Sequence, residues 1–143
     1  MRTKTTYTFD RPVKQVFAYL ADPQNRPQWQ SSITDLSLET EGPPRKGTRW
    51  QEKAKGIGTV EMEIVEFKPE RIWTEHGRGK TLEVRIRLDF SPEGSSTRVD
   101  VDATMRAQGM VRLLLPVARL VLPRIIRRDL ARAQPHIPPA TNG

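Results

Sequence analysis

Apolar residues recur along this chain with two different periods, one typical of strands and one typical of helices. The clearest strand pattern runs from Leu82 to Phe90, where apolar residues at every second position alternate with charged residues. Further apolar segments bounded by turn residues predict strands over residues 4–9, 33–39, 48–53, 59–67 and 72–76, with a last strand that ends near residue 106. Because the turns follow one another closely, the pattern predicts antiparallel hairpins with one solvated face and one packed face.

Two segments carry helical periodicity instead. Apolar residues at positions 13, 16, 17 and 20 predict a short amphipathic helix directly after the first strand. This helix ends at Asp22-Pro23, and a short irregular or helical connection follows and ends at Trp29. The order of elements is therefore strand, helix, many strands and one long helix, which a curved sheet wrapped around the final helix satisfies.

The long helix is predicted over Gly109–Ala133 and combines many apolar residues with arginines. Five apolar residues form one stripe at helical spacing: Met110, Leu113, Leu114, Val117 and Val121. Four others fall outside the stripe: Val111, Leu115, Leu122 and Ile126. We expect the stripe to be buried, and the additional apolar residues to meet a deeper core, a second subunit, a ligand or a lipid surface. Pro116 and Pro123 predict a curved or kinked helix.

Charge is distributed unevenly along the chain. The net charge is +7, and the segment from Arg106 onward holds seven arginines against a single acid, Asp129. A basic helix of this kind suits peripheral contact with an anionic membrane or an anionic ligand. The alternative is a solvated face, because the C-terminal end of a helix favours cations. Aromatic residues are not interleaved with the arginines, so we expect no nucleic-acid binding.

Composition excludes or disfavours several classes of site. The chain has no cysteine, which excludes disulfides, thiolate metal sites and a cysteine nucleophile. Two histidines provide no metal-ligand spacing, and no phosphate-binding loop opens a helix, so we expect neither a metal nor another cofactor. No signal peptide or membrane-spanning run is evident. We therefore expect a cytoplasmic protein with one domain over residues 1–133 and a loose tail over residues 134–143.

Two segments of the chain carry a resemblance to a known family. The run Phe9–Pro23, followed by Pro27-Gln28-Trp29, resembles the opening of the START-like superfamily, in particular its bacterial polyketide cyclase/dehydrase and lipid-transport group. The C-terminal segment Gly109–Leu130 resembles the closing helix of the same group. The resemblance implies an α+β helix-grip fold, in which a seven-stranded antiparallel curved sheet wraps around a long C-terminal helix, with short helices after the first strand. It also implies a cavity between sheet and helix, but its motifs mark the scaffold rather than a catalytic set.

The apolar strand faces and the helix stripe supply the candidate lining of that cavity. The predicted ligand-binding residues are Trp50, Met62, Ile64, Trp73, Val84, Ile86, Val101, Ala103, Leu113, Val117 and Val121. Such a lining suits an apolar or aromatic ligand, and either strand tryptophan is able to stack on a planar one. The alternative is that these side chains simply fill the core.

His76 is the candidate catalytic residue. It shares strand parity with Ile72 and Thr74, which predicts that it points inward, whereas the neighbouring Glu75 is predicted to face the opposite side. A cavity histidine suits general acid–base catalysis because its unperturbed pKa lies near neutrality. The alternative is a surface residue beside a glycine-rich turn.

Three functions remain open from the sequence. The first is a non-catalytic binder or carrier of a small hydrophobic molecule, such as a lipid, a quinone or a polyketide-like compound. The second is a polyketide cyclase or dehydratase that uses polar residues of the cavity. The third is an interaction module that forms a homodimer or another partner contact through Leu115, Leu122 and Ile126 of the C-terminal helix.

Overall fold

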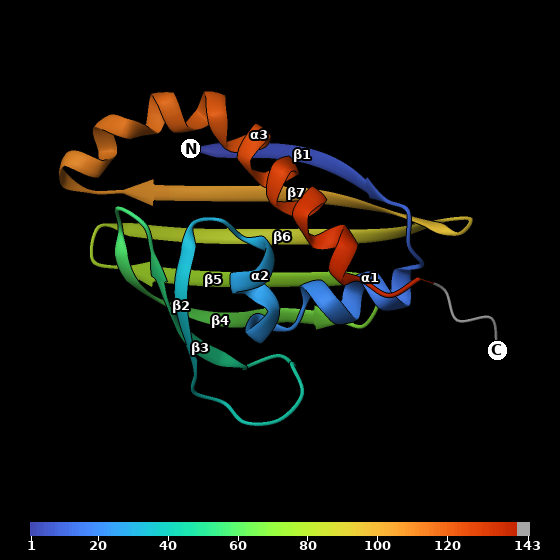
Figure 1. Ribbon diagram of the computed structural model, residues 1–143. Coiled ribbons are helices and arrows are strands. Elements are labelled where there is room, and N and C mark those ends of the chain that lie inside the picture. Colours follow the sequence, from blue (N-terminus) through green and yellow to red (C-terminus); the bar gives the residue numbers. More distant parts are fainter. Residues whose placement is uncertain (140–143) are drawn as a thin grey trace.

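The computed structural model describes residues 1–139 and is built around one seven-stranded antiparallel sheet (Figure 1). The strand order is β1-β7-β6-β5-β4-β3-β2. The strands are β1 (Arg2–Phe9), β2 (Ile33–Leu38), β3 (Arg49–Ala54), β4 (Gly58–Lys68), β5 (Ile72–Gly79), β6 (Leu82–Glu93) and β7 (Ser96–Ala107). The helices are α1 (Val13–Leu20), α2 (Arg26–Trp29) and α3 (Leu115–Ala133), with 3-10 turns η1 (Pro23–Asn25), η2 (Gly109–Leu114) and η3 (Gln134–His136). The predicted α+β helix-grip fold is confirmed.

The two faces of the sheet differ in chemistry, as the alternation predicts. The inner face, which faces the helices, carries the apolar residues of β6 and β7, among them Val84, Leu88, Val99 and Val101. The outer face carries charged side chains that pair on and between strands, as in Arg49–Glu63, Arg87–Asp89 and Arg98–Asp100, at 2.7, 2.9 and 3.1 Å. The core therefore lies on one side of the sheet only.

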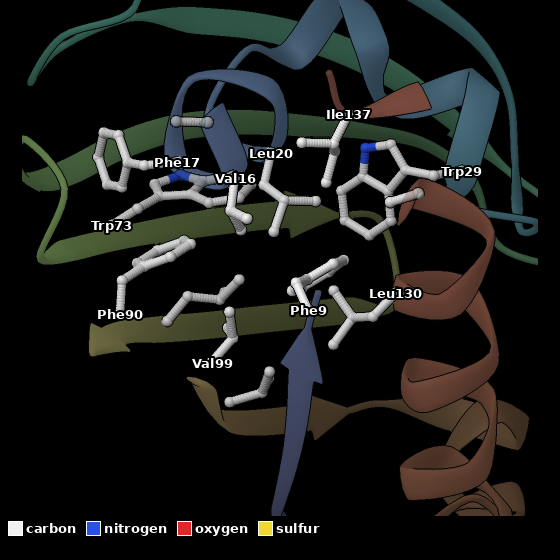
Figure 2. Packing of buried hydrophobic residues seen from close by; sticks show 14 of the residues in the cluster. Phe9, Val16, Phe17, Leu20, Trp29, Trp73, Phe90, Val99, Leu130 and Ile137 are labelled. Atoms are coloured by element: carbon white, nitrogen blue, oxygen red, sulfur yellow. The ribbon is translucent and has the colours of Figure 1, made fainter. Parts of the chain in front are cut away.

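The helices α1 and α3 close the core from the inner side. Phe17 of α1 packs edge-on against Phe90 of β6, with ring centroids 4.9 Å apart. Figure 2 shows the side chains of α1, of the strands and of the end of α3 meeting in one cluster. Leu130 of α3 and Ile137 beyond it belong to this cluster, and both are about 1% exposed. The second half of α3 is thereby fixed to the sheet.

The order of the chain extends beyond the predicted domain boundary at residue 133. Residues Gln134–His136 form η3, and Ile137 is buried in the core because its side chain fills the space beside α1 and α3. The prediction of a loose tail from residue 134 is therefore wrong for residues 134–137. The end of that predicted tail, residues 140–143, lies outside the described residues.

The C-terminal helix differs from its prediction in two respects. Residues 109–114 form the 3-10 turn η2, and the α-helix begins at Leu115. Pro116 therefore lies in the first turn of α3, where its missing N–H removes no helical hydrogen bond. Only Pro123 lies inside the helix, where it leaves the carbonyl of Arg119 without its usual donor.

The stripe that we expected to be buried faces solvent instead. Met110, Leu113 and Val117 are 82%, 72% and 60% exposed, and Val121 is 41% exposed. The inward residues are those that fell outside the stripe, Val111, Leu115, Leu122 and Ile126, together with Ala118 and Leu130. Both sets satisfy a helical period, so periodicity could not choose between them. The choice is made by the position of α3, which packs mainly against the edge strand β1.

Candidate ligand site

A cavity of about 60 Å³ lies between α2, α3 and the inner face of the sheet. Its apolar wall consists of Trp73, Ile86, Leu88, Val101, Ile126 and Leu130, and its polar or amphipathic wall consists of Arg26, Trp29, Gln30, Glu75 and Asp129. A volume of this size holds a few water molecules or one small chemical group. The lining combines a hydrophobic surface with a small number of convergent polar groups, which is the usual composition of a ligand site.

Arg26 and Glu75 form the polar end of this cavity. Arg26 lies on α2, Glu75 lies on the inner face of β5, and each is 2% exposed. The guanidinium donates two parallel hydrogen bonds to the carboxylate, with Nη1 2.7 Å from Oε1 and Nη2 bonded to Oε2. This bidentate geometry fixes both side chains and ties the short helix α2 to the middle of the sheet.

Two tryptophans enclose the guanidinium of Arg26. Its Cζ atom lies 5.2 Å from the ring centroid of Trp50 and 5.3 Å from that of Trp73, within range of a cation–π interaction. Trp50 also donates a hydrogen bond from Nε1 to Glu52 at 3.0 Å. Glu52 in turn lies 3.7 Å from Nε of Arg26. Arg26 is thus a buried cation that lies beside two buried carboxylates, Glu75 and Glu52.

Burial and neighbouring charges shift the pKa values of Arg26 and Glu75. Burial by itself would lower the pKa of Arg26, but the charges of Glu75 and Glu52 outweigh it and leave the pKa above its usual value. Burial raises the pKa of Glu75, contact with Arg26 opposes this, and the negative charge of Glu52 adds to it. The pKa of Glu75 therefore lies above its ordinary value, because the effect of burial exceeds the attraction of Arg26.

Asp129 of α3 lines the same cavity. Its Oδ1 accepts hydrogen bonds from the hydroxyl of Ser31 at 2.9 Å and from the Ser31 backbone N–H at 3.3 Å. Burial raises the pKa of Asp129, while the hydrogen bonds from Ser31 and the charges of Arg132 and Arg128 oppose that rise. Two carboxyl groups with raised pKa values, Glu75 and Asp129, therefore line one small space.

Four buried polar atoms of the lining residues have no hydrogen-bond partner within the described part of the chain. They are Nε of Arg26, Nε1 of Trp29, Nε1 of Trp73 and Oε1 of Gln30. Leaving a buried donor or acceptor unsatisfied costs about 1–3 kcal/mol. All four atoms belong to residues that line the cavity, which favours a ligand that carries an acceptor and a donor.

The structure brings together only part of the predicted lining. Trp73, Ile86 and Val101 line the cavity, and Trp50 stacks on Arg26 behind them. Met62, Ile64, Val84 and Ala103 are buried on the inner face without lining this cavity. Leu113, Val117 and Val121 project into solvent from the outward side of η2 and α3, so the prediction that they face the cavity is wrong.

His76 does not face the cavity, contrary to the parity prediction. The inward residues of β5 are Trp73, Glu75 and Gly77, which register with Leu88, Ile86 and Val84 of the inner face of β6. His76 lies on the outer face, where its Nε2 is 2.8 Å from Oε1 of Glu83. That hydrogen bond lowers the pKa of Glu83. Parity failed because Ile72 and Thr74 of the outer face are also buried, so apolar character marked both sides of the strand.

Sequence reasoning missed the polar residues of the site: Arg26, Gln30, Glu52, Glu75 and Asp129. A signal existed for two of them. Glu52 shares strand parity with Trp50, and Glu75 shares it with Trp73, so each strand places a carboxylate beside a tryptophan on the same face. No comparable signal marks Arg26, whose burial depends on the short helix α2 lying over the sheet.

Among residues 1–139, no three His, Cys, Asp or Glu side chains lie close enough together to hold a metal ion. Within the same residues, no helix is both long and apolar enough to cross a membrane.

The fold resembles several solved structures at low sequence identity. A hypothetical protein from Helicobacter pylori aligns with a TM-score of 0.79 and 13% identity, over 96% of this chain and 88% of that one. A protein from Thermus thermophilus aligns with a TM-score of 0.72 and 17% identity, over 94% and 95% of the two chains. DynU16, a putative protein in the dynemicin biosynthetic locus, aligns with a TM-score of 0.69 and 15% identity, over 94% of this chain and 46% of that one. At these identities the likeness concerns the fold alone.

Sequence comparison identifies the family directly. No curated protein matches the chain. Residues 1–137, however, match the family described as polyketide cyclase / dehydrase and lipid transport. The match spans the sheet, both sides of the cavity and the C-terminal helix. The chain therefore belongs to this polyketide cyclase/dehydrase and lipid-transport family, within the START-like superfamily.

Proposed function

We propose that this protein binds and carries a small hydrophobic molecule whose polar end is held beside Arg26 and Glu75. The observation that supports this proposal best is the group of four unsatisfied polar atoms around a cavity with an apolar wall. An acceptor on the ligand would satisfy the indole N–H of Trp29 or that of Trp73, and a hydroxyl would satisfy Oε1 of Gln30. A carbonyl or phenol on an apolar body matches this set of donors and acceptors.

The size of the cavity limits how much of the ligand lies inside it. About 60 Å³ accommodates the polar end of a lipid, quinone or polyketide-like molecule and not its whole body. Ile126 of α3 forms part of the wall and is half-buried. The rest of the ligand would therefore leave the cavity beside Ile126, between α3 and the sheet.

The two buried carboxyl groups support a second possible function, in which the protein is a cyclase or a dehydratase. Glu75 and Asp129 line one cavity and both have raised pKa values. A carboxyl group with a raised pKa is able to donate a proton to a ligand oxygen in its acid form and to take one from carbon in its ionised form. The family description includes cyclases and dehydrases, and the similarly folded DynU16 is encoded in a biosynthetic locus. Catalysis would then depend on Asp129, which is free of the bidentate pair, and not on His76.

The test is native mass spectrometry of the purified protein, followed by denaturing extraction of any bound molecule. The matched variants are Ile126→Trp, which fills the cavity, and Ile125→Trp, which places the same side chain one residue away and 40% exposed. We expect a co-purifying apolar molecule in the parent chain and in I125W, and its loss in I126W. A bound molecule that persists in I126W would refute this cavity as the site.

If no molecule co-purifies with the parent chain, the proposal is tested by titration with cis-parinaric acid, a fluorescent fatty acid. Binding by the parent and I125W, with about tenfold weaker binding by I126W, supports the proposal. Equal affinity in all three chains would overturn it. The catalytic alternative is separated by Asp129→Asn, which keeps the Ser31 hydrogen bonds but cannot exchange a proton at neutral pH. Retained ligand binding with lost turnover of the extracted molecule would favour the enzyme.

A further inference from the structure

The outward side of η2 and α3 carries an apolar surface that nothing in the described chain covers. We call it the outer stripe, and it consists of Met110, Leu113, Leu114, Val117, Leu120, Val121 and Ile125. Leu120 is 78% exposed and Leu113 is 72% exposed. Single exposed apolar residues are ordinary, but seven on one side of a continuous helical segment mark an interaction surface.

The charge around the outer stripe has one sign. Six arginines lie between residues 106 and 128, namely Arg106, Arg112, Arg119, Arg124, Arg127 and Arg128, and this segment contains no acidic residue. The acid that follows, Asp129, is 5% exposed and bonded to Ser31 inside the protein. The surface is therefore apolar toward the start of α3 and strongly basic toward its middle.

The position of the segment leaves this surface accessible. Figure 1 shows η2 and the first half of α3 beside β1, the strand at the edge of the sheet. The contact of α3 with the sheet is mainly with β1. Because the outward side chains of η2 and of the first half of α3 are exposed, a flat surface is able to approach them without meeting the rest of the fold.

We infer that the outer stripe docks the protein onto an anionic lipid bilayer. An amphipathic helix with an apolar face and flanking arginines lies in the interface, with its apolar side chains among the acyl chains and its cations at the phosphates. The inference rests on the proposed function, because a bilayer is the place where a carrier takes up or releases a hydrophobic ligand.

Charge favours a bilayer over a second copy of this chain. A two-fold dimer through the outer stripe would place the same surface against itself. Each copy would then bring its arginines toward those of the other, and residues 109–128, which carry the stripe, include no carboxylate to neutralise them. Anionic lipid supplies the opposite charge without any such repulsion.

The test is flotation of the full chain with vesicles of phosphatidylcholine, with and without phosphatidylserine. We expect binding only when phosphatidylserine is present. Leu113→Gln with Leu120→Gln should weaken binding by about tenfold or more, because two inserted side chains lose their apolar contact. Arg124→Gln with Arg127→Gln should weaken it by about 25-fold at low salt and reduce its salt dependence. The control Arg71→Gln with Arg85→Gln removes two exposed arginines elsewhere and should change the affinity by less than about twofold.

The variants replace exposed side chains, so their unfolding midpoints should match that of the parent. The inference would be overturned if the parent chain bound neither kind of vesicle, or bound both kinds equally. It would also be overturned if Arg71→Gln with Arg85→Gln weakened vesicle binding as much as Arg124→Gln with Arg127→Gln does. A monomer–dimer equilibrium that L113Q/L120Q abolishes would also overturn it and would assign the stripe to a second copy. Native mass spectrometry of L113Q/L120Q tests the two proposals separately. If this variant retains its ligand, a failure of vesicle binding concerns the docking surface alone and leaves the proposed function intact. Vesicle binding that survives in I126W supports docking even if that variant carries no ligand.

Discussion

Replacing Arg26 with methionine tests whether the buried ion pair is the central polar contact of the fold. Methionine keeps most of the side-chain volume but removes the bidentate bonds to Glu75 and the cation between two tryptophan rings. Both members of the pair are 2% exposed, so the water that screens surface ion pairs is absent. Removing one partner of a buried pair costs about 3–5 kcal/mol, because the other charge stays buried without compensation.

We expect Arg26→Met to lower the free energy of unfolding by about 4 kcal/mol. Domains of this kind have total stabilities of about 5–15 kcal/mol, so the loss is a large fraction of the whole. The corresponding fall in melting temperature is about 10 °C. The measurement is equilibrium unfolding in urea followed by far-UV circular dichroism, because the fluorescence of Trp50 and Trp73 would respond to the substitution itself. Arg71→Met, at an exposed arginine, serves as control.

A double variant and a change of pH make the reasoning more specific. Arg26→Met with Glu75→Met should cost less than Arg26→Met alone, because no unpaired carboxylate then remains at position 75. In the single variant the folded pKa of Glu75 rises further above its ordinary value of 4.5. A raised folded pKa means that stability falls as pH rises through that interval. The penalty of R26M should therefore be smaller below pH 4.5 than at neutral pH.

Two results would refute this account. A loss of less than about 1 kcal/mol in R26M is the range of a solvent-exposed pair and would contradict the burial of Arg26 and Glu75. Strict additivity of the two substitutions would show that Arg26 and Glu75 do not interact energetically.

Three further predictions concern single positions. Gly77→Ala should destabilise the fold by about 1–3 kcal/mol in urea unfolding, because the new methyl group would lie 2.8 Å from Cγ1 of Val84; an unchanged midpoint would contradict this packing. Asp129→Asn should raise the melting temperature at neutral pH and lose that advantage below pH 3.8, since burial raises the pKa of Asp129 and its ionisation costs stability; a variant that is less stable at neutral pH would reverse the sign. His76→Ala should leave native mass spectra and any turnover unchanged, because the ring lies on the outer face beside Glu83; loss of ligand or activity would restore the sequence prediction for His76.

The fold was largely predictable from sequence because most strands have one apolar face and one polar face. The alternation from Leu82 to Phe90 gives the correct inner face of β6, and the helical spacing before Asp22 gives α1. Prediction failed where two faces are similar. Both sides of β5 are buried over residues 72–75, and both sides of the C-terminal helix carry apolar residues. In such segments, contacts with residues far away in the chain determine which face points toward the core.

The polar site was harder to predict for a related reason. A carboxylate on an inner strand face contradicts the binary pattern unless its partner is known, and the partner of Glu75 lies 49 residues earlier. Local rules that fail in this way are expected at functional sites, where a buried polar group is retained at a cost in stability. Glu75, the inward carboxylate that the binary pattern could not explain, is accordingly one of the residues that line the cavity.

The two proposed activities use opposite faces of one helix at different points along its length. Toward its end, α3 turns Ile126, Asp129 and Leu130 to the cavity, and the cluster around Leu130 fixes this part to the sheet. Toward its start, the inward residues are only half-buried, and the outer stripe projects away from the fold. Pro123 lies between the two parts and removes a helical hydrogen bond there. Because the cavity residues and the outer stripe share no side chain, ligand binding and membrane docking are separable by mutation. Under these two proposals, the apolar surface of the helix that the sheet does not cover belongs to two partners, the ligand and the bilayer.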